Sequence, residues 1–117
     1  MRKESYEERF RNSLNKMLDI TLAKNSDYAP TDDALSNFYM VENLGLTTAE
    51  NWILVRLSDK LSRIANLLKN DAKTSVKDES IEDTLIDMAN YAIILKILLE
   101  DKRETEAMND SLQSNNE

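Results

Sequence analysis

The sequence predicts an all-α fold, built from three long helices and a short helix in a long loop. The 117 residues include one Gly and one Pro, far fewer than the tight turns of a sheet protein require. Apolar residues also recur at the three- and four-residue spacings of an amphipathic helix in three separate segments. At this length we expect one domain, and we place it at residues 1–103.

The composition excludes several classes of function. The chain has no Cys and no His, which excludes thiol chemistry, imidazole catalysis and the usual zinc sites. It carries 22 acidic and 15 basic residues, a net charge of −7, which argues against direct binding to nucleic acid. The N-terminal segment MRKESYEERF is charged, and no apolar run reaches the ~20 residues of a membrane span. We therefore expect a cytoplasmic protein without membrane contact.

The first long helix is predicted over residues 5–24. Ser5 and Glu8 have the spacing of a capping box at its start, and an apolar stripe follows at helical spacing. The next segment, residues 25–47, is rich in turn-forming residues, with a short helix over 34–41 and Gly45 near its end. A connection of this length is uncommon in a compact helical domain and is often functional.

The second long helix is predicted over residues 48–69, with Thr47 and Glu50 as its capping box. Its buried stripe is expected to consist of Leu54, Leu57, Leu61, Ile64, Ala65 and Leu68. A polar connector at 70–77 leads to the third long helix, residues 79–103. Residues 104–117 are polar, and we predict a disordered tail there.

The third helix is apolar on nearly every side between residues 93 and 99. A helix that is apolar all round is buried on both faces, and the other helices of one chain are too few to cover it. We therefore expect a homo-oligomer, most simply a twofold dimer with a helical interface or else a larger assembly, which completes the bundle.

Three carboxylates gather on one face at the start of this helix, namely those of Glu79, Asp83 and Asp87. Oxygen ligands without His or Cys suit Mg²⁺, so we predict these residues as metal ligands. Two other interpretations remain: a solvated acidic face, or ion pairs with cations of the second helix.

Those cations are Arg56, Lys60 and Arg63, which share the polar face of the second helix within two turns. Arg forks and Lys ammonium groups are the usual partners of phosphates, and aromatic rings of the loop can stack on a base. The predicted ligand-binding residues are Lys24, Asp27, Tyr28, Asn37, Arg56, Lys60, Arg63, Asn90 and Tyr91.

Taken together, the segments KNSDYA, SNF, VRLSDKLSRIANLL and DESIEDTLIDMANYAIIL resemble the nucleotide-modification-associated domain family, a small all-α group found largely in bacteriophages. The resemblance covers roughly residues 6–100. The third helix is also similar to the last catalytic helix of MazG-like all-α nucleotide pyrophosphohydrolases, through Asp87, Asn90 and Tyr91. The resemblance to those enzymes implies four-helix assemblies built by dimerisation, with Mg²⁺ held by ExxE and ExxD pairs. The second helix here has no ExxE, and Thr84 stands where the ExxD pair would begin.

Three functions remain open. The first is a phage-type protein that binds a nucleotide or nucleotide signal in a helical cleft and sequesters it to counter host defence. The second is a Mg²⁺-dependent nucleoside triphosphate pyrophosphohydrolase acting on normal or modified nucleotides. The third is an acidic helical protein that blocks a host protein. Compared with the MazG-like enzymes, this chain has fewer acidic ligands and more cations at the predicted site, which favours nucleotide binding over hydrolysis. The first two functions require the acidic and basic rows of the last two long helices to face one shared cleft.

Overall fold

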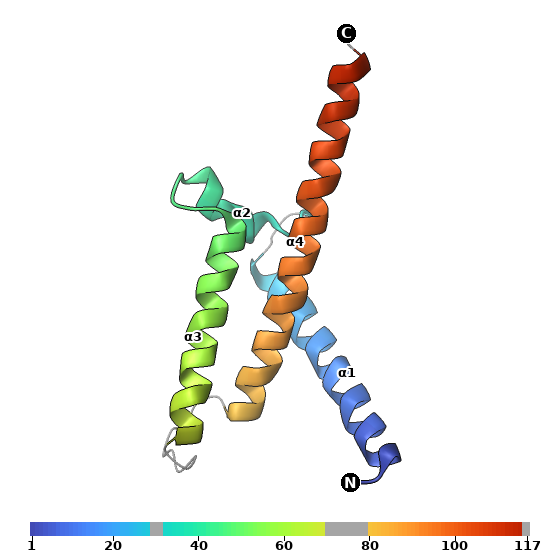
Figure 1. The fold of residues 1–117 in the computed structure, drawn as a ribbon, viewed down its shortest axis with the longest axis vertical. Helices are drawn as coiled ribbons and strands as arrows, with labels where there is room; N and C mark the ends of the chain where they lie inside the picture. The colour runs from blue at the N-terminus through green and yellow to red at the C-terminus, as the bar shows by residue number, and fades with distance from the viewer. Residues whose placement is uncertain (29–31, 70–79, 116–117) are drawn as a thin grey trace.

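The computed structural model describes residues 1–28, 32–69 and 80–115, and this part of the chain contains helices and no strands. The helices are α1 (Lys3–Tyr28), α2 (Ser36–Asn43), α3 (Ala49–Lys69) and α4 (Ile81–Asn115). Helix α3 packs along α4, α2 packs on α3, and α1 crosses α4 (Figure 1). The predicted all-α class, with three long helices and a short one, is confirmed.

Short polar side chains define where α3 and α4 begin. The Thr48 hydroxyl accepts a hydrogen bond from the backbone N–H of Asn51 at 3.1 Å, so the cap of α3 is not the predicted Thr47. The Ser80 hydroxyl accepts in the same way from the N–H of Asp83, also at 3.1 Å. Each bond satisfies one of the backbone donors that a helix start leaves unpaired.

Helix α2 ends at the one glycine. Gly45 has φ = 72°, the left-handed conformation in which a residue with a Cβ is strained. Its N–H donates to the carbonyl of Glu42, and the N–H of Leu46 donates to that of Val41, both at 2.9 Å. This pair of bonds is the Schellman motif, which turns the chain from α2 toward α3.

The structure corrects the predicted bounds of the long helices. Helix α1 extends beyond the expected 5–24, and α4 continues to Asn115 instead of ending near residue 103. The polar segment after Glu104 is therefore helical through Asn115. Its Met108 and Leu112 are 67% and 57% exposed, so they pack against nothing in the same chain.

The core is small and lies where α2, α3 and α4 meet. Ala49, Ile53 and Leu98 are fully buried there, with Phe38 and Tyr91 among the side chains packed around them. Among the described residues, no helix is both long enough and apolar enough to span a membrane.

The apolar stripe predicted to be buried on α3 is partly wrong. Ile64 is buried as predicted, whereas Leu54, Leu61 and Leu68 are more than half exposed in the single chain. Helix α3 buries Ile53 and Leu67, which were not in the predicted stripe. Helix α3 is apolar on two neighbouring sides, and only one of them packs against α4. On α4, Ile93, Ile97 and Leu99 also keep 38–48% of their surface exposed.

A polar cluster fixes α2 and the start of α3 to α4. The Lys102 ammonium donates to Glu42 at 2.5 Å and to Glu50 at 2.7 Å. Glu42 also accepts from the backbone N–H of Ala49 at 2.7 Å, and the Tyr39 hydroxyl donates to Asp101 at 2.8 Å. The side chains of Lys102, Glu42 and Glu50 are each about 30% exposed or less. Water therefore only partly screens the charge-assisted bonds between them.

The single chain forms an open shape. It measures 63 × 36 × 25 Å with a radius of gyration of 18.3 Å, whereas a compact chain of this length has about 13 Å. Helix α1 buries none of its residues, and it diverges from α3 and α4 at its N-terminal end (Figure 1).

Candidate functional site

A cleft of about 860 Å³ lies between the second half of α1, α2, the start of α3 and the middle of α4. This volume is within the range of small-molecule sites, roughly 300–1,000 Å³. Six of the predicted ligand-binding residues line the cleft: Lys24, Tyr28, Asn37, Arg56, Asn90 and Tyr91.

The carboxylate of Asp87 lies at the wall of this cleft, where α1, α3 and α4 meet. One oxygen is 3.2 Å from the Lys24 ammonium and the other is 3.4 Å from that of Lys60. The Asp87 side chain is 10% exposed, that of Lys60 is 16% exposed, and that of Lys24 is 54% exposed. Asp87 of α4 and Lys60 of α3 therefore meet in a partly buried place, and α1 contributes a second lysine.

Arg56 supplies a permanent positive charge to the same cleft. Its guanidinium carbon lies 6.0 Å from the centre of the Trp52 ring and 5.9 Å from that of Tyr91, distances at which cation–π attraction acts. A side-chain hydrogen bond with Tyr91 is the main reason that the pKa of Arg56 is raised above its ordinary value. The two rings hold the guanidinium at the cleft, where its planar donors suit a phosphate.

Aromatic and amide side chains form the rest of the wall. Tyr28, Phe38, Trp52 and Tyr91 all line the cleft. The Asn37 side-chain oxygen is buried and accepts no hydrogen bond within the described part of the chain. A buried acceptor without a partner costs about 1–3 kcal/mol, and at a pocket wall such an atom is a candidate ligand contact.

Asn90 has a structural partner as well as a place in the cleft. Its side-chain amide donates to the backbone carbonyl of Met17 at 3.1 Å. This bond ties α1 to α4 beside the ion pairs of Asp87, so one turn of α4 both lines the cleft and positions α1.

Other predicted residues lie elsewhere. Asp27, Lys60 and Arg63 are not part of the cleft lining, although Lys60 reaches Asp87. Asp83 pairs with Lys16 of α1 at 2.8 Å, not with α3. The hydrogen bond from this lysine is the main cause that lowers the pKa of Asp83, and the same bond raises the pKa of Lys16.

The predicted metal ligands are only partly described. Glu79 lies outside the described residues, and the carboxylates of Asp83 and Asp87 each have lysine partners. Within residues 1–28, 32–69 and 80–115, no three acidic side chains are grouped closely enough to hold a metal ion. The Mg²⁺ site stays a prediction.

Several lining residues were missed, and helical spacing would have found some of them. From Asp87, steps of three and four residues along α4 lead to Asn90 and then to Ile94, Ile97, Asp101 and Glu104, all of which line the cleft. The acidic members of this series lie close to or beyond the predicted helix end at residue 103. Asn25 was missed as well; its side-chain amide donates to the carbonyl of Ala34 at 2.7 Å and closes the loop beside the cleft.

Comparison with known protein families confirms the resemblance seen in the motifs. Residues 47–99 match the model of a family described as nucleotide modification associated domain 1. The matched segment contains α3 and the first half of α4, and therefore Arg56, Lys60, Asp87 and Tyr91. No curated protein and no solved structure matches the chain.

Proposed function

We propose that this chain, whose residues 47–99 match the nucleotide modification associated domain 1 family, binds a nucleotide in the cleft between α1, α2, α3 and α4. One observation carries the proposal: a cavity of about 860 Å³ combines an aromatic wall with cationic side chains from two helices. A nucleotide needs both, because its base is flat and apolar on its faces and its phosphates are anionic.

The phosphates are assigned to the end of the cleft that holds Lys24 and Arg56, beside which Lys60 pairs with Asp87. The Arg56 guanidinium can donate two parallel hydrogen bonds to one phosphate. Two lysines already converge on a single carboxylate, that of Asp87, and each ammonium has three donors. Lys24, which lines the cleft, can therefore contact a phosphate while it keeps Asp87 as a partner, and Lys60 neutralises Asp87 from beside the lining.

The base and sugar are assigned to the remaining wall. Tyr28, Phe38 and Trp52 offer ring faces for stacking, which is worth about 1–3 kcal/mol per base. Glu100 and Asp101 also line the cleft, and they repel phosphates while accepting hydrogen bonds from hydroxyl or amino groups. This charge distribution orients a nucleotide with its phosphates toward Asp87.

We propose retention of the intact nucleotide as the main activity, which in a phage would sequester a nucleotide signal of host defence. This proposal is supported by the two lysines that pair with Asp87. Lysine side chains can neutralise the negative charge of carboxylate and phosphate directly, without a metal ion. A Mg²⁺-dependent pyrophosphohydrolase would instead use carboxylates to hold metal and activate water. The binding experiment below separates the two activities.

We also propose that a second copy completes the bundle. The exposed leucines of α3, Leu54, Leu61 and Leu68, recur every seven residues, as do Leu85, Ala92 and Leu99 on α4. Such spacing forms a continuous apolar seam along each helix, and a partner covering both seams would bury the sides of α3 and α4 that one chain leaves exposed.

The test is calorimetric titration of the purified protein with nucleoside mono-, di- and triphosphates and with cyclic nucleotides, with and without Mg²⁺. Mass spectrometry of any co-purified small molecule guides the choice of ligand. We expect one class to bind and to be recovered intact. The variants Arg56→Gln and Lys24→Gln should each weaken binding at least about tenfold, or 1.4 kcal/mol. Lys69→Gln, an exposed change on the same helix as Arg56, is the matched control.

Two results would overturn the proposal. Equal loss of affinity in the Lys69→Gln variant would mean that overall charge, not the cleft, attracts the nucleotide. Release of pyrophosphate and a nucleoside monophosphate in Mg²⁺ would replace sequestration with hydrolysis. Capture of a host protein without any nucleotide binding would favour the third function, that of an acidic blocking protein.

A further inference from the structure

We infer that the C-terminal part of α4, residues 104–115, docks along the first half of α1 of a second copy of this chain. This contact goes beyond the proposed nucleotide site and does not depend on it. Four observations carry it: two exposed apolar surfaces, the directions of the two helices, their opposite charges, and the surface area that one chain leaves exposed.

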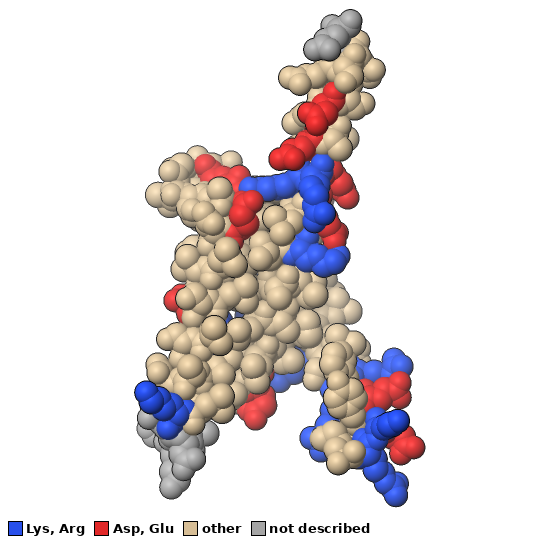
Figure 2. Space-filling model, viewed as in Figure 1, with Lys and Arg blue, Asp and Glu red and all other residues tan. Residues whose placement is uncertain are grey.

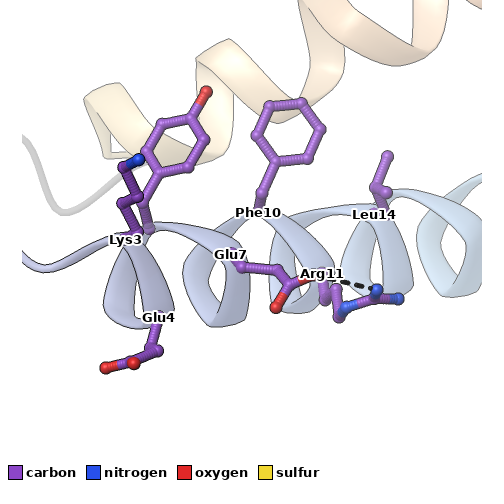
Figure 3. A pocket seen from close by; sticks show the side chains of 7 residues that line it. Lys3, Glu4, Glu7, Phe10, Arg11 and Leu14 are labelled. Atoms are coloured by element: carbon purple, nitrogen blue, oxygen red, sulfur yellow. Dashed lines mark hydrogen bonds and ion pairs between the residues drawn. The ribbon is translucent and has the colours of Figure 1, made fainter.

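The first surface is a stripe on α1. Tyr6, Phe10, Leu14, Leu18 and Leu22 recur every four residues, and each keeps 49–62% of its surface exposed. Phe10 and Leu14 project to the same side of the helix, Glu4 points away from them, and the Glu7–Arg11 ion pair lies along the helix surface (Figure 3). The residues that line the shallow surface here, from Lys3 to Leu14, all belong to α1, so the stripe is an open face of a single helix.

The second surface is the end of α4. Every described residue from Arg103 onward is exposed, and Met108 and Leu112 lie four residues apart on one side. Most of the stability of a helix in a protein comes from packing of its apolar side and not from helix propensity. A partner that covers Met108 and Leu112 supplies the missing stabilisation.

The directions of the helices exclude contact between these surfaces in one chain and favour it between two. From their crossing, α1 runs toward its N-terminus at the lower right and α4 runs toward its C-terminus at the upper right (Figure 1). The two free ends therefore point away from each other, so the end of α4 reaches α1 only in a second copy. Figure 2 shows few charged side chains over the middle of α3 and α4, a face that the same partner can cover.

The charges of the two segments are complementary. Residues 1–16 contain five basic and three acidic side chains, whereas residues 104–115 contain three acidic side chains and no basic ones. The chain as a whole carries −7, so two copies repel each other at long range. Local attraction between these ends therefore favours their pairing over other ways of covering the apolar surface.

The exposed area is large enough for such an interface. The chain exposes 9201 Å², whereas a compact monomer of 13.5 kDa exposes about 6,500 Å². The excess of roughly 2,700 Å² exceeds the ~800 Å² that each partner buries in a standard interface. One dimer can thus bury the α3–α4 face and the α1 stripe together.

The absence of cysteine from the sequence allows a direct test by disulfide formation. We would prepare Phe10→Cys combined with Met108→Cys, and Phe10→Cys combined with Leu112→Cys. The matched control is Glu8→Cys with Met108→Cys, because residue 8 lies about 200° around the helix from residue 10. Mild oxidation of the full chain should give covalent dimers on a non-reducing gel in at least one of the first two variants and not in the control.

A second measurement uses a chain that ends after Glu104, which keeps the cleft lining. Sedimentation equilibrium should show dimerisation weakened at least about tenfold relative to the full chain, with the helices retained by circular dichroism. A full-length protein that is monomeric at all concentrations would overturn the inference. So would a dimer that is unaffected by the truncation, or one whose Phe10→Cys pairs form no more disulfide than the control.

Discussion

Replacement of Asp87 by Asn tests whether the carboxylate at the meeting point of α1, α3 and α4 stabilises the fold. Asparagine has nearly the same shape, so the change removes charge without creating a cavity. Removing one partner of a fully buried ion pair costs about 3–5 kcal/mol, because it leaves an uncompensated charge. Here Lys60 is 16% exposed and cannot hydrate freely, whereas Lys24 is 54% exposed and can. We therefore expect a loss of about 2 kcal/mol.

The assay is urea unfolding at pH 7 and at one fixed protein concentration, because self-association adds to apparent stability. The midpoint should fall while the dependence on urea stays the same. Asp59→Asn is the control: this carboxylate is 64% exposed and lies 3.7 Å from Arg56, so its loss should change stability by less than about 0.5 kcal/mol.

A double-mutant cycle with Lys60→Met assigns the effect to the pair. Because methionine removes the cation that faces Asp87, the double variant should be more stable than the sum of the single losses predicts, by about 1 kcal/mol or more. A loss below about 0.5 kcal/mol in Asp87→Asn, or additive losses in the cycle, would refute the view that this cluster is a buried electrostatic joint.

The same variant separates the two nucleotide functions. If phosphates bind Lys24, Asp87→Asn removes a competing anion, and nucleotide affinity should rise by several-fold despite the lower stability. If Asp87 holds a catalytic metal, the variant should lose Mg²⁺-dependent turnover. Titration calorimetry and a pyrophosphate-release assay on one preparation distinguish these outcomes.

Three further predictions concern the cluster at α2. A backbone hydrogen bond and then Lys102 lower the pKa of Glu42, and Lys102 lowers the pKa of Glu50. The stabilisation from these two carboxylates is therefore fully present above pH 4.5, and it is lost as the pH falls through their lowered pKa values in the folded chain. Urea unfolding of Lys102→Met should thus show a weaker pH dependence in acid. Burial and then the bond to Asp101 raise the pKa of Tyr39 to about 12, so stability should fall between pH 10 and 12 in the wild type and much less in Tyr39→Phe, as measured by circular dichroism. Gly45→Ala should cost about 1 kcal/mol in urea unfolding through backbone strain alone, because a Cβ there meets no atom within 4 Å; an unchanged midpoint would show that α2 ends differently.

Local sequence signals predicted the helices well because they act over a few residues. The apolar spacing located three long helices, and Gly45 marked the end of α2. The buried side of α3 was harder to predict, since Ile53 and Leu54 begin two neighbouring apolar stripes with similar periodicity. Only the position of α4 decides that Ile53 is buried and Leu54 exposed.

The candidate site shows the same division between local and tertiary information. Arg56, Lys60 and Tyr91 were predicted from residue type and helical face, and all three lie in or beside the cleft. Lys24 was assigned to the ligand, but its ion pair with Asp87 was not foreseen because it depends on where α1 crosses α4. The partner of Asp83 was misassigned for the same reason: Lys16 of α1 takes the place expected for a cation of α3.

The composition of α4 follows from the number of surfaces that it must form. One side carries Asp87 and continues through Ile94 and Ile97 to the cleft, and the neighbouring side buries Leu98 against the core. On the side opposite Asp87, Leu85 and Leu99 stay 48% and 38% exposed in the single chain. An apolar residue on that side contributes to folding only when another surface removes it from water, at roughly 25 cal/mol per Å². The ligand, the core and the partner thus each require a side of α4, and together they account for a helix that is apolar all round. A single chain without ligand meets only the requirement of the core.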